Sequence, residues 1–582
     1  MLVNSLYSLW VKLPKTLKNR FYVCLVISVF ASIFEIATLA SLIPFVTVFL
    51  RPEAINMLSI FGENFTNIYF LNSDNISLVL LAFFFIFILA STITRIYLLK
   101  LQTSSAMNVG TFLSLDILER FMYMRYEVFS SISHSEIISL VYQKTYLVVH
   151  KTVLPCILIV SNCIIVGLVG SVVLAIEPLM TAMILLVICF FYIFISSSIR
   201  QKLINYSETL DNNYEALMKI LNSALGNYRE AKLYQEEKRY LSTYKKMDVA
   251  LRDAETKVSV ISGVPRYALE ALLMFFLIAA TVVMKNAGYD TGGIISSIAI
   301  VAIAGQRLAP LAQGIYANYT FLKANQKILK SITSNFDQFS RVENEIFHGT
   351  SSKQGEEKFQ TIEFRDVSFK YQGNTVNVLT NINFKLNAGE FVGITGPSGS
   401  GKSTLLDVLL TFLDLDSGII LFNGKKLDVE TKFNWMNNIS LVSQDVFIDF
   451  ESVKKNITGV DERLSPHEEQ KLESVLNLTC LKDQIGKFEH GLETSVGERG
   501  SKISGGQRQR IALAKALYRG RPVVILDEAT SALDEQMQTE VLKNLKSLED
   551  RPTILLVTHR LNSLEHCDRI YSMNNGHLEI EK

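Results

Sequence analysis

The stretch Phe391-Val-Gly-Ile-Thr395-Gly396-Pro-Ser-Gly-Ser-Gly-Lys402-Ser-Thr404 decides the fold of the C-terminal part of the chain. A short apolar strand runs into a glycine-rich loop with the pattern G-x-x-x-x-G-K-S, and an apolar helix follows from Leu405. In this context glycines let backbone N–H groups close around phosphate oxygens, and the helix N-terminus adds the positive end of its dipole. The stretch therefore predicts a P-loop α/β domain that binds a nucleotide.

The loop assigns most of the predicted nucleotide contacts. Lys402 is expected to reach the β- and γ-phosphates, and the Ser403 hydroxyl is expected to ligate Mg²⁺. ATP and Mg²⁺ are thus the predicted ligands. The predicted contacts in the loop are Gly396, Ser398, Gly399, Ser400, Gly401, Lys402, Ser403 and Thr404.

A second apolar strand, 523–526, ends in the acidic pair Asp527-Glu528. An acidic pair at a strand end near a P-loop places Asp527 on the metal and Glu528 beside the γ-phosphate. Glu528 could then polarise the attacking water. The pair predicts a hydrolytic site.

The composition of the whole chain points to a membrane protein. Of 582 residues, 19% are charged and 49% are apolar, against about 25% charged in soluble domains. The net charge of +1 argues against a nucleic-acid binder held by overall charge, so no nucleic-acid partner is expected. Bulk disorder is excluded as well, because it needs low hydrophobicity and high net charge.

The apolar residues gather before residue 330 in six runs. Each is long enough for a helix that crosses a hydrocarbon core of about 30 Å, which takes roughly 20 residues. Buried helices of soluble proteins rarely reach such lengths six times in succession. The expected spans are about 21–50, 76–99, 152–176, 178–199, 263–284 and 291–322.

Lysine and arginine set the predicted orientation. They gather before the first span and in the two long connections, 100–151 and 200–257, so both termini and these connections are expected in the cytoplasm. Both connections read as helix, with turns near Ser130–Ser135 and Ser207–Tyr214. Helices this long should leave the membrane, and the turns should dock near Gln444.

The segment Ile503-Ser504-Gly505-Gly506-Gln507 resembles the signature motif of ABC transporters, with Ile503 where leucine is usual. The resemblance extends along the whole chain and gives further residues their expected roles. These are Tyr371 (stacking on adenine), Gln444 (Q-loop, metal), Ser531–Asp534 (D-loop), His559 (switch histidine) and Thr494–Gly500 (a loop typical of exporters).

The resemblance implies a half-size exporter. The expected domains are a membrane domain 1–330, a linker 331–357 and an ATPase domain 358–582. The family works as a dimer, in which the P-loop of one subunit and Ser504–Gln507 of the other enclose each ATP. The motifs are intact, so a homodimer is the simpler expectation. The expected catalytic residues are Glu528, His559 and Gln444.

Two stretches of the membrane half resemble bacterial lipid-linked oligosaccharide flippases. They are Phe34–Phe45 in the first span and Pro265–Glu270 in the fifth; a short outer helix within Arg51–Asp74 is a third similarity. The resemblance implies a multi-pass protein of the bacterial inner membrane that moves a lipid-linked glycan. Other amphipathic cargo (a peptide, a drug or a lipid A-like lipid), an ATP-gated channel or regulator, and an importer are the alternatives.

Charged residues inside spans are candidates for function because burying them in lipid is costly. Arg266 and Glu270 are spaced to pair on one helix, and Glu35 is expected to bond a neighbouring helix. Arg95 and Arg307, near span ends, are expected to snorkel to the interface. Alternatively the arginines line the cavity and bind a pyrophosphate-linked head.

Overall fold

The computed structural model describes residues 2–50, 73–176, 178–288, 291–340, 357–371, 373–497, 500–529, 532–548 and 551–581. The chain forms two compact units, one of Met1–Met124 and Val128–Ile346, the other of Arg125–Glu127 and Phe347–Lys582. The expected outer helix within Arg51–Asp74 falls almost wholly outside the described residues.

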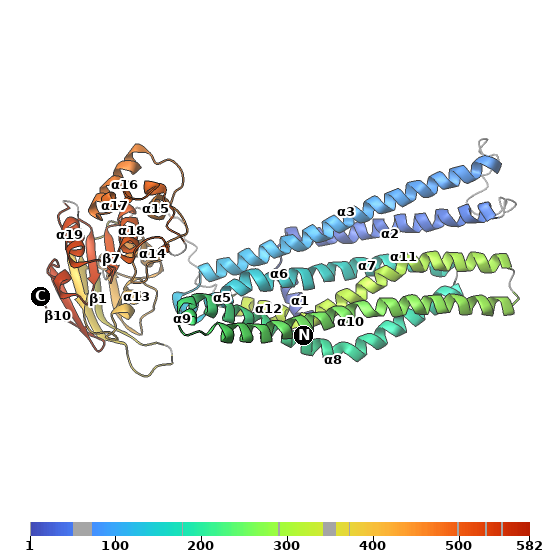
Figure 1. The fold of residues 1–582 in the computed structure, drawn as a ribbon, viewed down its shortest axis with the longest axis horizontal. Coiled ribbons are helices and arrows are strands. Elements are labelled where there is room, and N and C mark those ends of the chain that lie inside the picture. The colour runs from blue at the N-terminus through green and yellow to red at the C-terminus, as the bar shows by residue number, and fades with distance from the viewer. Residues whose placement is uncertain are drawn as a thin grey trace. The chain divides into compact units, whose positions relative to one another are not determined.

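Among the described residues, the membrane unit has six helices that are long and apolar enough to cross a membrane, as the sequence predicts, and Figure 1 shows them running along one another. Several extend well beyond a bilayer: α10 has 50 residues, which is about 75 Å of helix. The six are α2 (Lys15–Leu50), α3 (Ser73–Met122), α7 (Leu154–Ile176), α8 (Pro178–Gly226), α10 (Glu237–Asn286) and α11 (Thr291–Ala324).

The spans expose apolar side chains outward, as a bilayer requires. Phe190 and Phe275 are 73% and 75% exposed. The small buried core between α2, α3, α7 and α11 is also apolar, and its members are Ala31, Leu39, Leu98, Ile165, Val169, Val173 and Ala304. These helices are therefore apolar both on their outer face and on the face that packs against the other helices. An apolar outer face is expected of a helix that is surrounded by lipid and not by water.

The first predicted turn lies where the sequence places it. Ser133 caps the next helix, because its hydroxyl accepts a hydrogen bond from the Glu136 N–H at 3.3 Å. Helix α4 (Tyr126–Ser131) precedes this turn, and short α-helical and π-helical segments follow it and lead into α7. The segments that follow are α5 (His134–Ile138), η2 (Ser139–Lys144), α6 (Thr145–Val148) and η3 (Val149–Val153).

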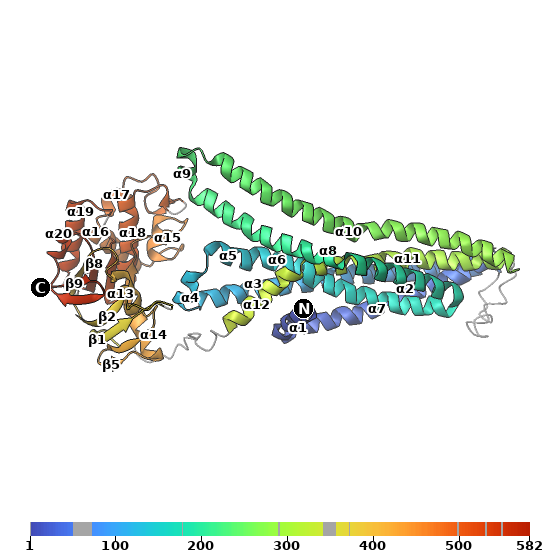
Figure 2. The same cartoon turned by 90° about the horizontal axis from the view of Figure 1, so that it is seen from below.

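The second predicted turn was wrong. The polar stretch Ser207–Tyr214 lies inside α8, and the chain turns back only at α9 (Tyr228–Leu233), between α8 and α10 (Figure 2). The polar side chains of this stretch are satisfied within the helix and by its neighbours: Asn213 donates to the Thr209 carbonyl at 2.8 Å, and Tyr214 donates to Glu255 of α10 at 2.6 Å. Bonded in this way, they do not interrupt the helix.

The same stretch anchors a helix in the region predicted as linker. Helix α12 (Gln326–Ser340) follows α11, and its Lys327 N–H donates to the Ser207 hydroxyl at 3.1 Å. Ile328, Leu329 and Ile332 are buried in the cluster that also holds Leu9 of α1 (Leu2–Lys12). The beginning of the predicted linker is therefore a packed helix.

The ATPase unit contains two sheets. One has the order β2-β1-β4-β5 and the other β10-β9-β3-β8-β7-β6. The strands are β1 (Thr361–Phe369), β2 (Leu379–Asn387), β3 (Phe391–Thr395), β4 (Ser417–Phe422), β5 (Lys425–Lys426), β6 (Ile439–Val442), β7 (Val523–Asp527), β8 (Thr553–Val557), β9 (Arg569–Asn574) and β10 (His577–Ile580).

Helices surround these sheets. Three of them matter for the site: α13 follows β3, α18 begins at the signature segment, and α19 follows β7. The helices are α13 (Lys402–Leu409), α14 (Val429–Asn437), α15 (Val453–Thr458), α16 (Pro466–Leu478), α17 (Lys482–Ile485), α18 (Gly505–Tyr518), α19 (Glu535–Lys546) and α20 (Leu561–Leu564).

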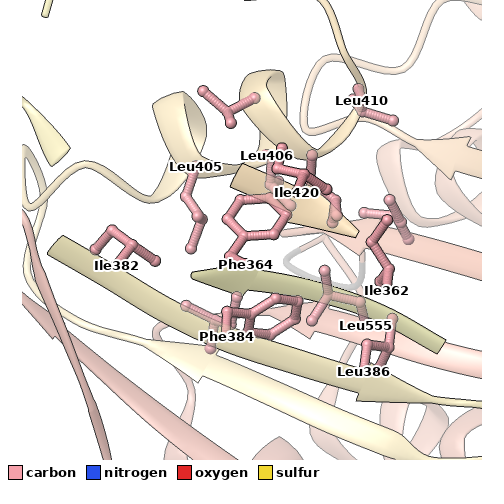
Figure 3. Packing of buried hydrophobic residues seen from close by; sticks show 14 of the residues in the cluster. Ile362, Phe364, Ile382, Phe384, Leu386, Leu405, Leu406, Leu410, Ile420 and Leu555 are labelled. Atoms are coloured by element: carbon pink, nitrogen blue, oxygen red, sulfur yellow. The ribbon is translucent and has the colours of Figure 1, made fainter. Parts of the chain in front are cut away.

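The main core of this unit lies between the two sheets and α13. Figure 3 shows Phe364 of β1 beside Phe384 of β2, with Leu405 and Leu406 of α13 nearby. The two rings meet edge to face, with centroids 5.7 Å apart, a favoured aromatic geometry. This packing fixes α13, and with it the loop that precedes it.

Candidate functional site

The candidate site lies at the carboxyl ends of four neighbouring parallel strands. β3 pairs with β8, β8 with β7, and β7 with β6, all in parallel. Parallel strands present their carboxyl ends at one edge of a sheet, where ligands bind in open α/β folds. The edge gathers residues distant in sequence: the loop from Gly396, then His559, Asp527 with Glu528, and Gln444.

The glycines of the loop are required by close approach and by backbone conformation. A Cβ at Gly396 would lie 2.2 Å from the Met573 carbonyl oxygen. Gly401 has φ +109° and caps α13, a backbone conformation that favours glycine. Only glycine lets the chain turn this tightly from β3 into the helix.

Lys402 and Ser400 face into the loop. The Lys402 ammonium donates to the Gly396 and Pro397 carbonyls at 2.8 and 2.9 Å, and burial lowers its pKa, against the opposing effect of Glu528 and Asp527. The Ser400 hydroxyl is buried without a partner among the described residues. A buried hydroxyl without a partner is costly, so the cradle suits an oxygen-rich ligand such as the phosphates of ATP.

Glu528 is held from two sides. Its Oε2 accepts from the Gln444 amide at 2.8 Å, and its Oε1 lies 2.8 Å from His559 Nε2. Its φ of +47° is unusual for a residue other than glycine, and such strain gathers at functional sites. The three residues predicted as catalytic therefore meet at one point.

Two further carboxyls adjoin this point. Burial raises the pKa of Asp527, and the charge of Glu528 adds to the effect while Lys402 opposes it. Burial and the charge of Asp527 raise the pKa of Asp407, on α13, to about 6. A divalent cation would neutralise such a gathering of carboxyls, and the hydroxyl of Ser403 and the carboxylate of Asp527 are the hard oxygen ligands that Mg²⁺ prefers.

The other predicted contacts divide into two groups. The Tyr371 hydroxyl lies 3.2 Å from Thr404 Oγ1, so this aromatic ring adjoins the loop. Ser504 instead caps α18, accepting from the Gln507 N–H at 3.2 Å. Among the described residues, none of Ser504, Gly505, Gly506 and Gln507 forms a hydrogen bond or ion pair with the loop of the same chain, and Ser531 lies outside the described residues.

Two residues that the sequence did not single out form hydrogen bonds with the backbone of the described part of the D-loop. Gln509 Oε1 accepts from the Ala532 N–H at 2.9 Å, and Arg560 donates to the Leu533 carbonyl at 2.9 Å. Both stand next to recognised motifs, two residues after Gln507 and one after His559. Their positions beside these motifs could therefore have indicated a role at the site, although their residue types could not.

In the membrane unit, Glu35 joins three helices. Its side chain is 1% exposed and lies 2.6 Å from Arg95 of α3 and 2.7 Å from Arg307 of α11. The expectation that both arginines snorkel was wrong, because the buried carboxylate offers them a charged partner within the protein. Arg266 and Glu270 pair on α10 at 2.9 Å, as their spacing predicts.

Comparisons with known proteins agree with this architecture. The family described as "ABC transporter transmembrane region" matches residues 21–308, and "ABC transporter" matches 379–531. A solved bacterial Atm1-family ABC exporter with ATP bound has a similar fold, with a TM-score of 0.74 over 97% of this chain and 95% of the other at 20% identity.

Curated relatives include the ATP-dependent lipid A-core flippases of Escherichia coli K12 and Salmonella paratyphi A. Each is 41% identical over 215 residues, which is 37% of this chain and 37% of the relative. The chain thus spans little more than a third of the length of the curated relatives that it matches. With a membrane region and an ATPase region both matched on one polypeptide, the chain belongs to the ABC transporters, in the half-size exporter arrangement.

Proposed function

We propose that this protein is an ATPase that drives an amphipathic lipid across the bacterial inner membrane. The observation that carries the proposal is the meeting of Gln444, Glu528 and His559 beside the phosphate loop, on a chain that also has six membrane-spanning helices. The ATPase unit and both termini would lie in the cytoplasm, on the side where lysine and arginine gather.

The chemistry follows from the groups at the strand ends. The Glu528 carboxylate would accept a proton from water as that water attacks the γ-phosphate, giving ADP and phosphate. Gln444 and His559 hold the carboxylate in place, and Lys402 would place positive charge on the phosphates. Mg²⁺, when bound by Ser403 and Asp527 with Gln444 adjacent, supplies charge neutralisation to the phosphate oxygens.

A homodimer completes the site. Ser504–Gln507 sits at the N-terminus of α18, where backbone N–H groups and the helix dipole favour anions. Since these residues form no hydrogen bond or ion pair with the phosphate loop among the described residues of their own chain, a second copy would bring them to the γ-phosphate from the opposite side. Two ATP molecules would then be enclosed between two subunits.

For the cargo we favour a lipid-linked oligosaccharide. The cluster of Glu35, Arg95 and Arg307 holds two cations against one anion, so it keeps one excess positive charge within the spans. Arg266 carries no such excess charge, because it is neutralised by Glu270. A phosphate head that must cross the hydrocarbon would be attracted to the excess charge, and arginine suits phosphate through its planar fork.

Lipid A-core is the second candidate cargo, favoured by the names of the curated relatives. Stimulation of ATPase activity in nanodiscs distinguishes the two. We expect a polyprenyl diphosphate oligosaccharide to stimulate phosphate release more strongly than lipid A-core does, and Lys402→Ala to abolish both responses. Stronger stimulation by lipid A-core would overturn the preferred cargo, and stimulation by neither would overturn lipid transport.

A further inference from the structure

Two neighbouring cavities lie within the membrane unit. The larger, of about 630 Å³, is lined by α7, α8 and α11, with Leu273 of α10. The smaller, of about 360 Å³, is lined by α8, α10 and α11. They share part of one wall, made of Ile184, Leu273, Val301, Gly305 and Ala309. Their volumes fall within the usual range of ligand sites, about 300–1,000 Å³.

The larger cavity is elongated and mostly apolar. Its lining follows α8 from Thr181 to Arg200, which is about 28 Å at 1.5 Å per residue. This nearly equals the hydrocarbon thickness of about 30 Å. Aliphatic side chains dominate the lining, and Arg200 stands at the end nearer the cytoplasmic extension of α8. A cavity of this length and lining fits one extended apolar chain.

The smaller cavity carries a group of polar side chains on otherwise apolar spans. Arg266, Glu270, Gln306 and Gln313 all line it. Gln313 is held in place, since it donates to the Ser262 carbonyl at 2.7 Å and accepts from the Tyr192 hydroxyl at 3.1 Å. Gln306 is exposed and has no hydrogen-bond partner among the described residues.

An unpartnered amide within a membrane span is costly against lipid, so such groups mark ligand paths. Amides and carboxylates offer both the donors and the acceptors that sugar hydroxyls require. The polar side chains of the smaller cavity therefore suit a different ligand group from the cluster of Glu35, Arg95 and Arg307. The former can bind sugar hydroxyls, whereas the excess positive charge of the latter suits phosphate.

We propose that the two cavities form one binding site for a single lipid molecule with a sugar head and one long apolar chain. The larger cavity holds the chain, and Gln306, Gln313 and Glu270 bind sugar hydroxyls in the smaller. The assignment rests on the proposed function and deepens it. It names the residues that recognise the sugar, and it limits the lipid in this site to one apolar chain.

Gly305 stands where the cavities meet and gives a clean test. Glycine within a helix costs about 1 kcal/mol relative to alanine. A Cβ at this position would have no atom within 4 Å. The first carbon of a larger side chain would thus meet no neighbour, and the rest of the side chain would occupy the space that the two cavities share. Gly305→Leu should block the site while the helix is retained or slightly stabilised.

The experiment measures equilibrium binding to the full-length protein in nanodiscs. The probes are a polyprenyl diphosphate disaccharide and the same polyprenyl diphosphate without sugar. We expect wild type to bind the glycosylated probe about fivefold to tenfold more tightly, as one or two hydrogen bonds would give. Gln306→Leu should remove that preference, and Gly305→Leu should weaken both probes at least tenfold.

Gln201→Leu is the matched control, since Gln201 is an exposed glutamine on α8 that lines neither cavity. Basal ATPase activity and thermal unfolding of each variant report whether the fold is retained. Gln313→Leu loses two hydrogen bonds between helices. Its binding of the probes is therefore interpreted only if its unfolding temperature is unchanged. Unchanged binding in Gly305→Leu, or an unchanged sugar preference in Gln306→Leu, would overturn the site alone, whereas a wild type that binds neither probe would overturn the cargo as well.

Discussion

Replacement of Glu35 by glutamine tests the most buried charge of the membrane unit. The carboxylate is 1% exposed and faces Arg95 at 2.6 Å and Arg307 at 2.7 Å. A glutamine can accept from one arginine through its oxygen, but its NH₂ group would face the other, donor against donor. Removing one member of a buried ion pair costs about 3–5 kcal/mol, because the remaining charge is left uncompensated. The side chains of Arg95 and Arg307 are 39% and 24% exposed, so we expect Glu35→Gln to lower the free energy of unfolding by less than that, about 2–3 kcal/mol.

A double-mutant cycle distinguishes the effect of the uncompensated charge from a simple packing effect. Arg307→Gln alone leaves the pair Glu35–Arg95 neutral, so its cost should be the smaller. The double variant Glu35→Gln, Arg307→Gln leaves one cation rather than two, and should be more stable than Glu35→Gln alone. Denaturant unfolding of the full-length protein in lipid–detergent micelles measures all three. Wild-type stability of Glu35→Gln, or a double variant less stable than the single, would show that Glu35 does not compensate the charge of the two arginines.

The other predictions concern the ATPase unit. Glu528→Gln should keep ATP binding and lower turnover by about 100- to 10,000-fold; phosphate release at the wild-type rate would reject Glu528 as the base. Lys402→Ala should weaken ATP binding itself, and an unchanged dissociation constant would contradict its phosphate role. Asp407 has a folded pKa of about 6 against about 3.9 unfolded, so its ionisation destabilises the fold as pH rises from 4 to 6. Asp407→Asn should stabilise the unit by about 1 kcal/mol at pH 7, after a discount for solvent screening, and not at pH 4; an equal effect at both pH values would contradict this.

Much of the architecture could be predicted because its signals are local. Six apolar runs of sufficient length define six spans, and the strand–glycine loop–helix pattern around Lys402 defines the phosphate cradle. The convergence of Gln444, Glu528 and His559 was predictable only through the family, although each follows a short apolar strand of the parallel sheet. Parallel strand ends share one edge, and this geometry brings the three together.

The remainder depends on contacts between distant parts of the chain. The polar stretch Ser207–Tyr214 looks like a turn, but Lys327 and Glu255, far away in sequence, satisfy its side chains. Arg95 and Arg307 look like snorkelling residues until the fold places Glu35 between them. The cavities around Gly305 arise from the packing of four helices, α7, α8, α10 and α11, and leave no local pattern. Long-range partners of this kind cannot be read from periodicity or spacing.

The most direct test of the central claim is ATP-driven lipid movement by the purified protein in proteoliposomes. A fluorescent polyprenyl diphosphate oligosaccharide is placed in both leaflets, and its accessibility to an added glycosidase is followed with ATP outside. We expect a change in accessibility that requires ATP and is absent in Lys402→Ala and Glu528→Gln. Movement at the same rate without ATP, or an ATP-dependent ion current with no lipid movement, would contradict it.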